Sequence, residues 1–301
     1  MTWQLAVLFK VLAGSLVAPF VFYLLGKVGP RERIAHVAFM FTWAFGFAIA
    51  IAGIPTEFPP TLWPITLVGA LVVVGVYFQL RAVALSPSLS AIFVSLTSLI
   101  PLFMSGFQLG EWNALADTTL LGGVVLAISG IALWIYQDVH ERRRKGEPDV
   151  VPRSFWFHGT AFAVVLGIAI YLQNVWAKGG VSPDNFVFAW YGGTLLGAGV
   201  LFLVSRTFPR GEKRMGTPKE VILTGIAGLV IVTSMWFQYM SFALVAQTLV
   251  MPIYAVGDVV GYAAVGIVIG IITRKWATIR GLKWLALAMG LAGAIIIALA
   301  H

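Results

Sequence analysis

Three charged residues lie within long apolar stretches of the sequence, where an ionised group is costly and usually faces a cavity. Asp258 lies between Gly257 and Gly261, small residues that let a neighbouring helix or a ligand approach closely. An ionised carboxylate is unfavourable at this depth, so we expect Asp258 to stay protonated until a cation, a ligand amine or a base such as Lys10 approaches. Loss and gain of this proton by Asp258 predict proton or cation coupling. The structural alternative is a protonated Asp258 that only forms a hydrogen bond to a neighbouring helix. Lys10 and Arg81 are also candidates, although either side chain is long enough to reach the membrane surface.

Amide and aromatic side chains supply further hydrogen-bonding groups within the same stretches. A buried amide needs partners, so Gln79 and Gln238 either join helices or line opposite mouths of one pathway. Five more aromatic or amide side chains lie within apolar stretches. They complete the candidate lining of a substrate site: Trp43, Gln173, Asn174, Tyr239 and Tyr254. Pro252 is a candidate gating residue because a proline inside a helix frees a carbonyl and kinks the helix, although packing alone can also select it. Trp236 is the second gating candidate.

The composition indicates where these residues must lie. Hydrophobic residues make up 59% of the 301-residue chain, charged residues make up only 11%, and the mean hydropathy is +0.92. In soluble domains, by contrast, about a quarter of the residues are charged. The apolar residues fall into stretches of about twenty or more, each long enough to cross roughly 30 Å of hydrocarbon as a helix. The sequence therefore predicts an all-α integral membrane protein.

Charged residues, prolines and glycines divide the apolar sequence into ten predicted transmembrane helices. The spans are 3–26, 34–54, 62–85, 86–109, 118–139, 157–178, 186–206, 220–244, 245–271 and 278–301. The third and fourth spans, like the eighth and ninth, follow one another with almost no loop, so each pair is predicted to form a tight hairpin. We expect a single membrane domain made of a five-helix unit over 1–139, a basic linker over 140–156 and a second five-helix unit over 157–301.

The two units share a repeated segment. YFQLRAVAL at 77–85 closes the third span and WFQYMSFAL at 236–244 closes the eighth, with an offset of 159 positions. Gly122 and Gly281 have the same offset and open the last helix of each unit. Chance matching of common membrane residues is the alternative to duplication. Because five crossings separate the two segments, duplication predicts two inverted five-helix repeats, an architecture that recurs in secondary transporters.

One region of each unit resembles a known family. SLSAIFVSLTSLIPLFMSGFQLGE at 88–111, followed by LLGGVVLAISGIALWI at 120–135, is similar to the small-residue, Pro, Leu-Gly-Glu and Gly-rich pattern of EamA-type members of the drug/metabolite transporter superfamily. The second unit resembles this pattern more loosely over 243–297, and Glu111 has no equivalent there. The resemblance spans nearly the whole chain. It implies a ten-helix carrier of small polar metabolites, such as amino acids, sugars or drug-like solutes, that works by proton coupling or exchange.

The basic residues predict the orientation in the membrane. Of the 20 Lys and Arg residues, 17 fall in four segments on one predicted face: 27–33, 142–153, 206–219 and 274–283. Short cytoplasmic loops are enriched in Lys and Arg, so this face is predicted to be cytoplasmic and both termini non-cytoplasmic. Characterised carriers of the resembled family mostly keep both termini in the cytoplasm. We expect a multi-pass protein of the cell membrane.

Other classes of protein are not favoured by the sequence. The net charge of +8 comes from residues at helix ends, where anionic lipid headgroups attract them, so nucleic acid is not an expected partner. A Gly-rich phosphate loop, an HExxH motif and a GxSxG motif are all absent from the sequence, and no enzyme is predicted. The chain has no Cys, and its four His are expected to be interfacial, so neither a metal nor another cofactor is expected.

We therefore expect a secondary active transporter that moves a small solute by alternating access, as a monomer or a homodimer in the lipid bilayer. A channel or a divalent-cation permeation pathway is one alternative, but it usually shows a ring of acids along the pore, and only one acid is deep here. A lipid scramblase or a structural membrane protein is another alternative, and it needs no buried charge.

Overall fold

A computed structural model describes residues 1–28, 34–85, 87–115, 117–144, 152–207, 217–273 and 282–300. This part of the chain forms helices joined by short loops, and no β-strand occurs in it. The helices are α1 (Trp3–Lys10), the π-helical segment η1 (Val11–Val17), α2 (Ala18–Val28), α3 (Ile34–Ala52), η2 (Pro60–Leu62), α4 (Trp63–Leu85), α5 (Pro87–Gln108), η3 (Glu111–Leu115), α6 (Thr118–Arg144), α7 (Arg153–Lys178), α8 (Pro183–Thr207), α9 (Pro218–Leu244), α10 (Gln247–Thr273) and α11 (Leu282–Ala300).

The apolar helices confirm the prediction of an all-α, multi-pass membrane protein. Within the described residues, eight helical stretches are long and apolar enough to cross a membrane. One of them, Trp3–Val28, is made of α1, η1 and α2 in succession. Helices α5 and α10 run beside these stretches with lengths of 22 and 27 residues.

The observed helices follow the predicted spans with small shifts at their ends. Each predicted span overlaps a helix, and the predicted breaks in both hairpins are present: α5 begins at Pro87 and α10 at Gln247. Helix α6 continues to Arg144 and α7 begins at Arg153, so both helices extend into the predicted linker over 140–156. Glu and Arg are good helix formers, which explains the extension of α6. Gly281, one of the two glycines used to support the repeat, lies outside the described residues.

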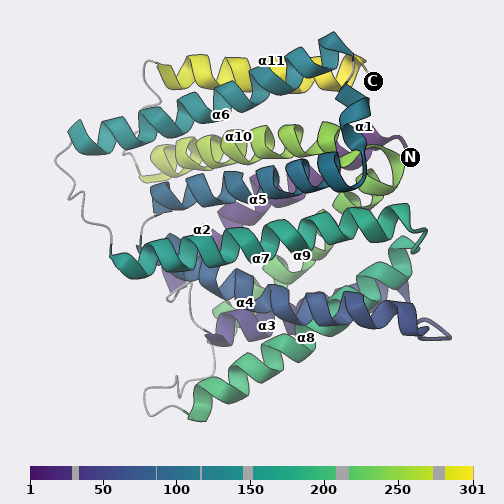
Figure 1. Ribbon diagram of the computed structural model, residues 1–301. Coiled ribbons are helices and arrows are strands. Elements are labelled where there is room, and N and C mark those ends of the chain that lie inside the picture. Colours follow the sequence, from purple (N-terminus) through teal and green to yellow (C-terminus); the bar gives the residue numbers. More distant parts are fainter. Residues whose placement is uncertain are drawn as a thin grey trace.

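Helices from the two halves of the chain pack against each other throughout the bundle. Figure 1 shows α6 and α11 side by side, with α10 and α5 next to them. Helix α5 also packs against α7, and α4 packs against both α7 and α8. On the other side of the bundle α3 packs against α8 and α9, while α1 and η1 pack against α9 and α10 respectively. Both chain termini lie at the same end of the bundle (Figure 1).

His36 lies near a helix end, as the sequence indicates, and is buried against a neighbouring helix. It lies in the first turn of α3 and is buried, with 1% of the residue exposed. Its Nε2 lies 3.3 Å from Oε1 of Glu220, which is in the first turn of α9 and is also buried. Burial is tolerated because α3 and α9 pack together and place the carboxylate beside the imidazole.

Candidate functional site

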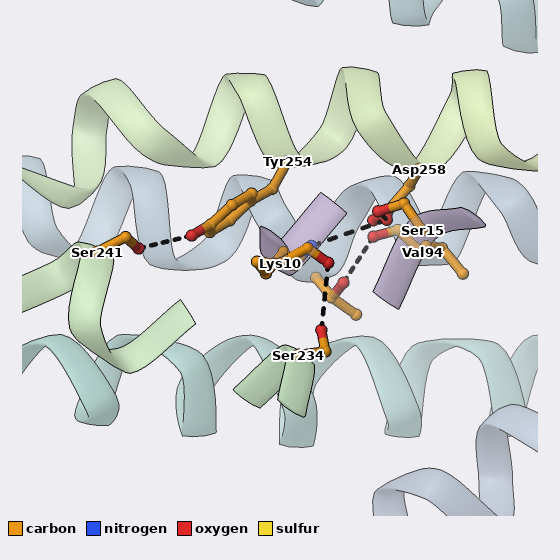
Figure 2. A network of polar contacts seen from close by, with 8 residues as sticks. Lys10, Ser15, Val94, Ser234, Ser241, Tyr254 and Asp258 are labelled. Atoms are coloured by element: carbon orange, nitrogen blue, oxygen red, sulfur yellow. Dashed lines mark hydrogen bonds and ion pairs between the residues drawn. The ribbon is translucent and has the colours of Figure 1, made fainter. Parts of the chain in front are cut away.

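Asp258 and Lys10 meet in the interior of the bundle. Asp258 comes from α10 and Lys10 from the end of α1, and Figure 2 shows their side chains turned toward each other. Lys10 Nζ lies 3.8 Å from Asp258 Oδ1, and Ser15 of η1 donates a hydrogen bond to the same oxygen at 2.5 Å. Only 8% of Lys10 is exposed, so this side chain faces the interior and not the membrane surface. We call Lys10, Ser15 and Asp258 the ion-pair cluster.

Tyr254 supports the ion-pair cluster from the preceding turn of α10. The centre of its ring lies 4.1 Å from Lys10 Nζ, in a cation–π contact. Its hydroxyl is hydrogen-bonded to Ser241 of α9 at 2.6 Å (Figure 2), so the ring is fixed in place. A desolvated ammonium needs such compensation, and Lys10 receives it from both a carboxylate and a ring face.

Pro19 explains the local shape of the backbone at the ion-pair cluster. Proline has no N–H, so the carbonyl of Ser15, four residues earlier, loses its α-helical donor. The helix widens into the π-helical segment η1, which ends two residues before Pro19, and π segments occur at many functional sites. A Cβ placed on Gly261 of α10 would clash with the Ser15 carbonyl oxygen, so α10 approaches η1 through a glycine. This close approach sets Ser15 and Asp258 within hydrogen-bond distance.

A cavity of about 240 Å³, here named the Asp258 cavity, reaches the carboxylate. Its polar lining consists of Gln79, Thr97 and Asp258, and its apolar lining includes Phe22 and Val76. The Asp258 side chain is 24% exposed, whereas that of Lys10 is 10% exposed and does not line the cavity. A small molecule in this cavity therefore meets the carboxylate before it meets the ammonium group.

A second cavity of about 200 Å³ adjoins the first and shares Phe22, Val76 and Gln79 with it. We call it the glutamine cavity, because Gln79, Gln173 and Gln238 all line it. Gln238 Nε2 donates a hydrogen bond to Gln173 Oε1 at 2.9 Å. Gln173 Nε2 is buried and finds no hydrogen-bond partner among the described residues. The structure thus brings both glutamines of the repeated segment to one cavity.

A separate polar network ties α5, α7 and α10 together at one end of the bundle. Glu111 accepts hydrogen bonds from Asn174 Nδ2 at 2.9 Å and from the backbone N–H of Thr248 at 3.2 Å. Ser105 donates to Gln247 Oε1 and accepts from Asn174 at 3.2 Å. Glu111 therefore supplies an acceptor at the start of α10, where helix N–H groups lack partners. Asn174, a predicted lining residue, belongs to this network and lines neither cavity.

Trp43 and Tyr239 also lie apart from the two cavities. Trp43, a predicted lining residue, is 43% exposed because α3 places its ring over Gly225 of α9 at the surface of the bundle. Tyr239 is fully buried, but its ring stacks on Phe186 with a centroid distance of 3.8 Å. Its hydroxyl donates to the Val181 carbonyl at 2.8 Å, so the contacts of Tyr239 join helices.

The remaining candidates lie in ordinary helical surroundings. Pro252 is buried within α10, which runs from Gln247 to Thr273 as one helix. Trp236 is half-buried and packs against the hydrophobic core. Arg81 is exposed, and its Nε donates a hydrogen bond to the Tyr77 hydroxyl at 3.0 Å, one turn earlier on α4. This position agrees with a side chain that extends along the helix surface toward the membrane interface.

Sequence reasoning missed Ser15, the residue in closest contact with Asp258. A signal for it exists in the sequence, because Gly14-Ser15 precedes Pro19 by one turn in an apolar helix. The lining residues Phe22 and Thr97 were not predicted either, since nothing in their local sequence distinguishes them from other membrane-helix residues. Among the described residues there is no group of three or more His, Cys, Asp or Glu side chains that could hold a metal ion.

Comparison with known proteins identifies the fold but no family. No family model matches the sequence, and no curated protein matches it either. The chain is similar to a solved structure that is described only as the crystal structure of a protein, with a TM-score of 0.69 and 17% sequence identity. The match covers 98% of this chain and 99% of the other chain. At this identity the likeness establishes a shared fold alone.

Proposed function

We propose that this protein is a secondary active transporter of a small polar solute, and that it works by alternating access. The observation that carries the proposal is the ion-pair cluster, in which a carboxylate inside the bundle lines a cavity of about 240 Å³ and has a buried lysine as its partner. Charged groups within membrane helices are costly and mark solute or proton pathways. The resemblance of the sequence to EamA-type transporters supports the same function.

The packing of the helices supports an inverted repeat of two five-helix units. The repeat equates α1, η1 and α2 with α7, and equates α3, α4, α5 and α6 with α8, α9, α10 and α11 in that order. Under this equivalence, the contact of α4 with α8 corresponds to that of α9 with α3. The contact of α5 with α7 corresponds to that of α10 with η1. The contact of α4 with α7 corresponds to that of α9 with α1. The equivalence leaves the α3–α8, α5–α10 and α6–α11 contacts unchanged, and all of these contacts are present.

The glycine contacts support the repeat at the level of single residues. A Cβ on Gly69 of α4 would clash with the carbonyl oxygen of Trp190 on α8. Gly228, which is 159 positions after Gly69, has the equivalent contact, because its Cβ would lie 2.8 Å from the carbonyl oxygen of Met40 on α3. Trp190 lies on α8 and Met40 lies on α3, the two helices that the repeat exchanges. Two halves that rock against each other about a central site fit this symmetry.

The proposed orientation, with both termini outside the cytoplasm, predicts a simple labelling result. The protein has no Cys, so a single introduced Cys reports its own location. A Cys at Gly146 should be protected from an impermeant thiol reagent added outside intact cells, and a Cys at Pro59 should react, because the basic segment at 142–153 is expected to be cytoplasmic. Labelling at Gly146 from outside would reverse the assignment.

Counterflow in liposomes tests the transport function itself. A thermal-shift screen of the purified protein against metabolites identifies a solute first, since a ligand at 100 times its Kd stabilises the folded state by about 2.7 kcal/mol. Liposomes preloaded with this solute should then take up labelled solute faster than empty liposomes. The reason is that a carrier with bound solute reorients across the membrane more readily than an empty carrier. Equal rates would favour a channel, and the absence of solute movement would contradict both transport functions.

A further inference from the structure

We propose that the glutamine cavity binds the planar, uncharged end of a substrate whose ammonium group binds Asp258, so that the substrate is an arylalkylamine bearing a carboxamide. This inference rests on the proposed transport function and names a substrate class for it. The two adjoining cavities carry the inference, because one presents a carboxylate and the other presents amides within an aromatic wall.

The size and wall of the glutamine cavity fit one aromatic ring. Its volume is about 200 Å³, whereas an apolar cavity of about 150 Å³ in another protein holds benzene. Phe41, Trp190 and Tyr191 contribute rings to the wall, and aromatic rings favour stacked or edge-to-face contacts with one another. The Tyr191 hydroxyl donates to the Ile231 carbonyl at 3.0 Å, so this polar atom already has a partner.

The polar part of the glutamine cavity favours a hydrogen-bonding ligand. Gln173 is fully buried, and its Nε2 has no partner among the described residues. A buried donor without an acceptor is unfavourable, so a ligand carbonyl that accepts from Gln173 Nε2 removes a cost as well as adding a bond. A carboxamide fits the paired amides of Gln173 and Gln238 because it offers both an acceptor and a donor.

The charged end of the substrate is set by Asp258. Ser15 and Lys10 both contact Oδ1, and 24% of the Asp258 side chain is exposed. A carboxylate accepts about four hydrogen bonds, so it can accept another one from a ligand ammonium group in the Asp258 cavity. Gln79 lines both cavities, so the two cavities are adjacent and the proposed molecule must extend past this side chain.

Binding of three related probes to the purified full-length protein tests this arrangement. The probe 4-(aminomethyl)benzamide carries both groups, benzylamine lacks the carboxamide and benzamide lacks the amine. In the unmodified protein the first probe should bind about fivefold to tenfold more tightly than benzylamine, the effect of one buried hydrogen bond. Gln173→Leu should abolish this difference, because it removes the donor that the ligand carbonyl needs. Gln137→Leu on α6, the same substitution outside both cavities, should preserve it.

Two further variants make the result decisive. Gln173→Leu leaves Gln238 without its partner and can reduce stability, so Gln173→Leu/Gln238→Leu repeats the test with neither amide present. Replacing both charges, in Lys10→Gln/Asp258→Asn, should weaken the two amines and leave benzamide unchanged. Equal affinities for all three probes, or a preference for the carboxamide that survives the loss of Gln173 and Gln238, would overturn the inference. Binding that follows the expected pattern without counterflow would retain the site and reject transport. Counterflow of another solute together with equal affinities for the three probes would retain transport and reject the site.

Discussion

Replacement of Asp258 by Asn is expected to abolish the response of solute uptake to a pH gradient while exchange of the same solute across the membrane continues. Asn keeps the shape and hydrogen bonding of Asp but cannot carry a proton. A gradient of one pH unit supplies about 1.4 kcal/mol per coupled proton, which corresponds to about tenfold accumulation. Uptake into liposomes with and without this gradient measures the effect, and the variant should lose the whole tenfold difference.

Lys10 must be included in this test, because it lies 3.8 Å from Asp258 and is buried. Asp258→Asn leaves its ammonium without a counter-charge, which costs about 3–5 kcal/mol when a buried pair is broken from one side. The double variant Lys10→Gln/Asp258→Asn removes both charges and should recover thermal stability, yet it should still lack the pH response.

The single variant Lys10→Gln decides which of the two residues carries the proton. It retains Asp258, so uptake should still follow the pH gradient if Asp258 is the coupling residue. Loss of the response in Lys10→Gln together with its retention in Asp258→Asn would assign the coupling to Lys10. Any response that survives in the double variant would show that coupling occurs elsewhere in the protein.

Much of the helical architecture can be predicted from the sequence, because a bilayer allows few alternatives. A backbone in hydrocarbon must satisfy its own hydrogen bonds, so a long apolar stretch is read as a helix with little ambiguity. Even the breaks at Pro87 and near Gln247 follow from the length of helix that fits the membrane. Boundaries outside the hydrocarbon are less constrained, and for this reason the extension of α6 to Arg144 was not predicted.

The candidate site is only partly predictable from the sequence. The depth of a residue in the membrane can be inferred from its place in an apolar stretch, whereas the direction in which its side chain points cannot. Asp258, Lys10 and Tyr254 were selected for their depth, and they come together in the structure. Trp43 was selected on the same ground, but α3 places it at the surface. The helical pattern gives little guidance, because membrane helices are apolar on every side and show no single face toward the core.

At Gly261 the sequence indicates a close approach to a neighbouring helix, and the structure identifies the contact. Substitution of Gly261 by Ala should destabilise the protein by about 1–3 kcal/mol, the usual cost of adding a side chain to a filled space. The new Cβ would clash with the carbonyl oxygen of Ser15, so η1 and α10 must move apart. Since Ser15 and Lys10 hold Asp258 from the first helix, the same displacement should weaken the ion-pair cluster and the pH response of uptake.

Two control variants separate the effect on stability from the effect on the site. Gly199→Ala adds a Cβ with no atom within 4 Å and should leave the melting temperature unchanged or slightly raised. Gly193→Ala on α8 creates a clash of the same kind with the carbonyl oxygen of Thr66 on α4, and neither residue lines the Asp258 cavity or the glutamine cavity. It should lower the melting temperature as Gly261→Ala does, yet preserve the pH response of the protein that remains folded. If Gly261→Ala and the clash control on α8 lose the pH response to the same degree, the loss follows from reduced stability. The close packing of η1 on α10 then has no special role in positioning Asp258.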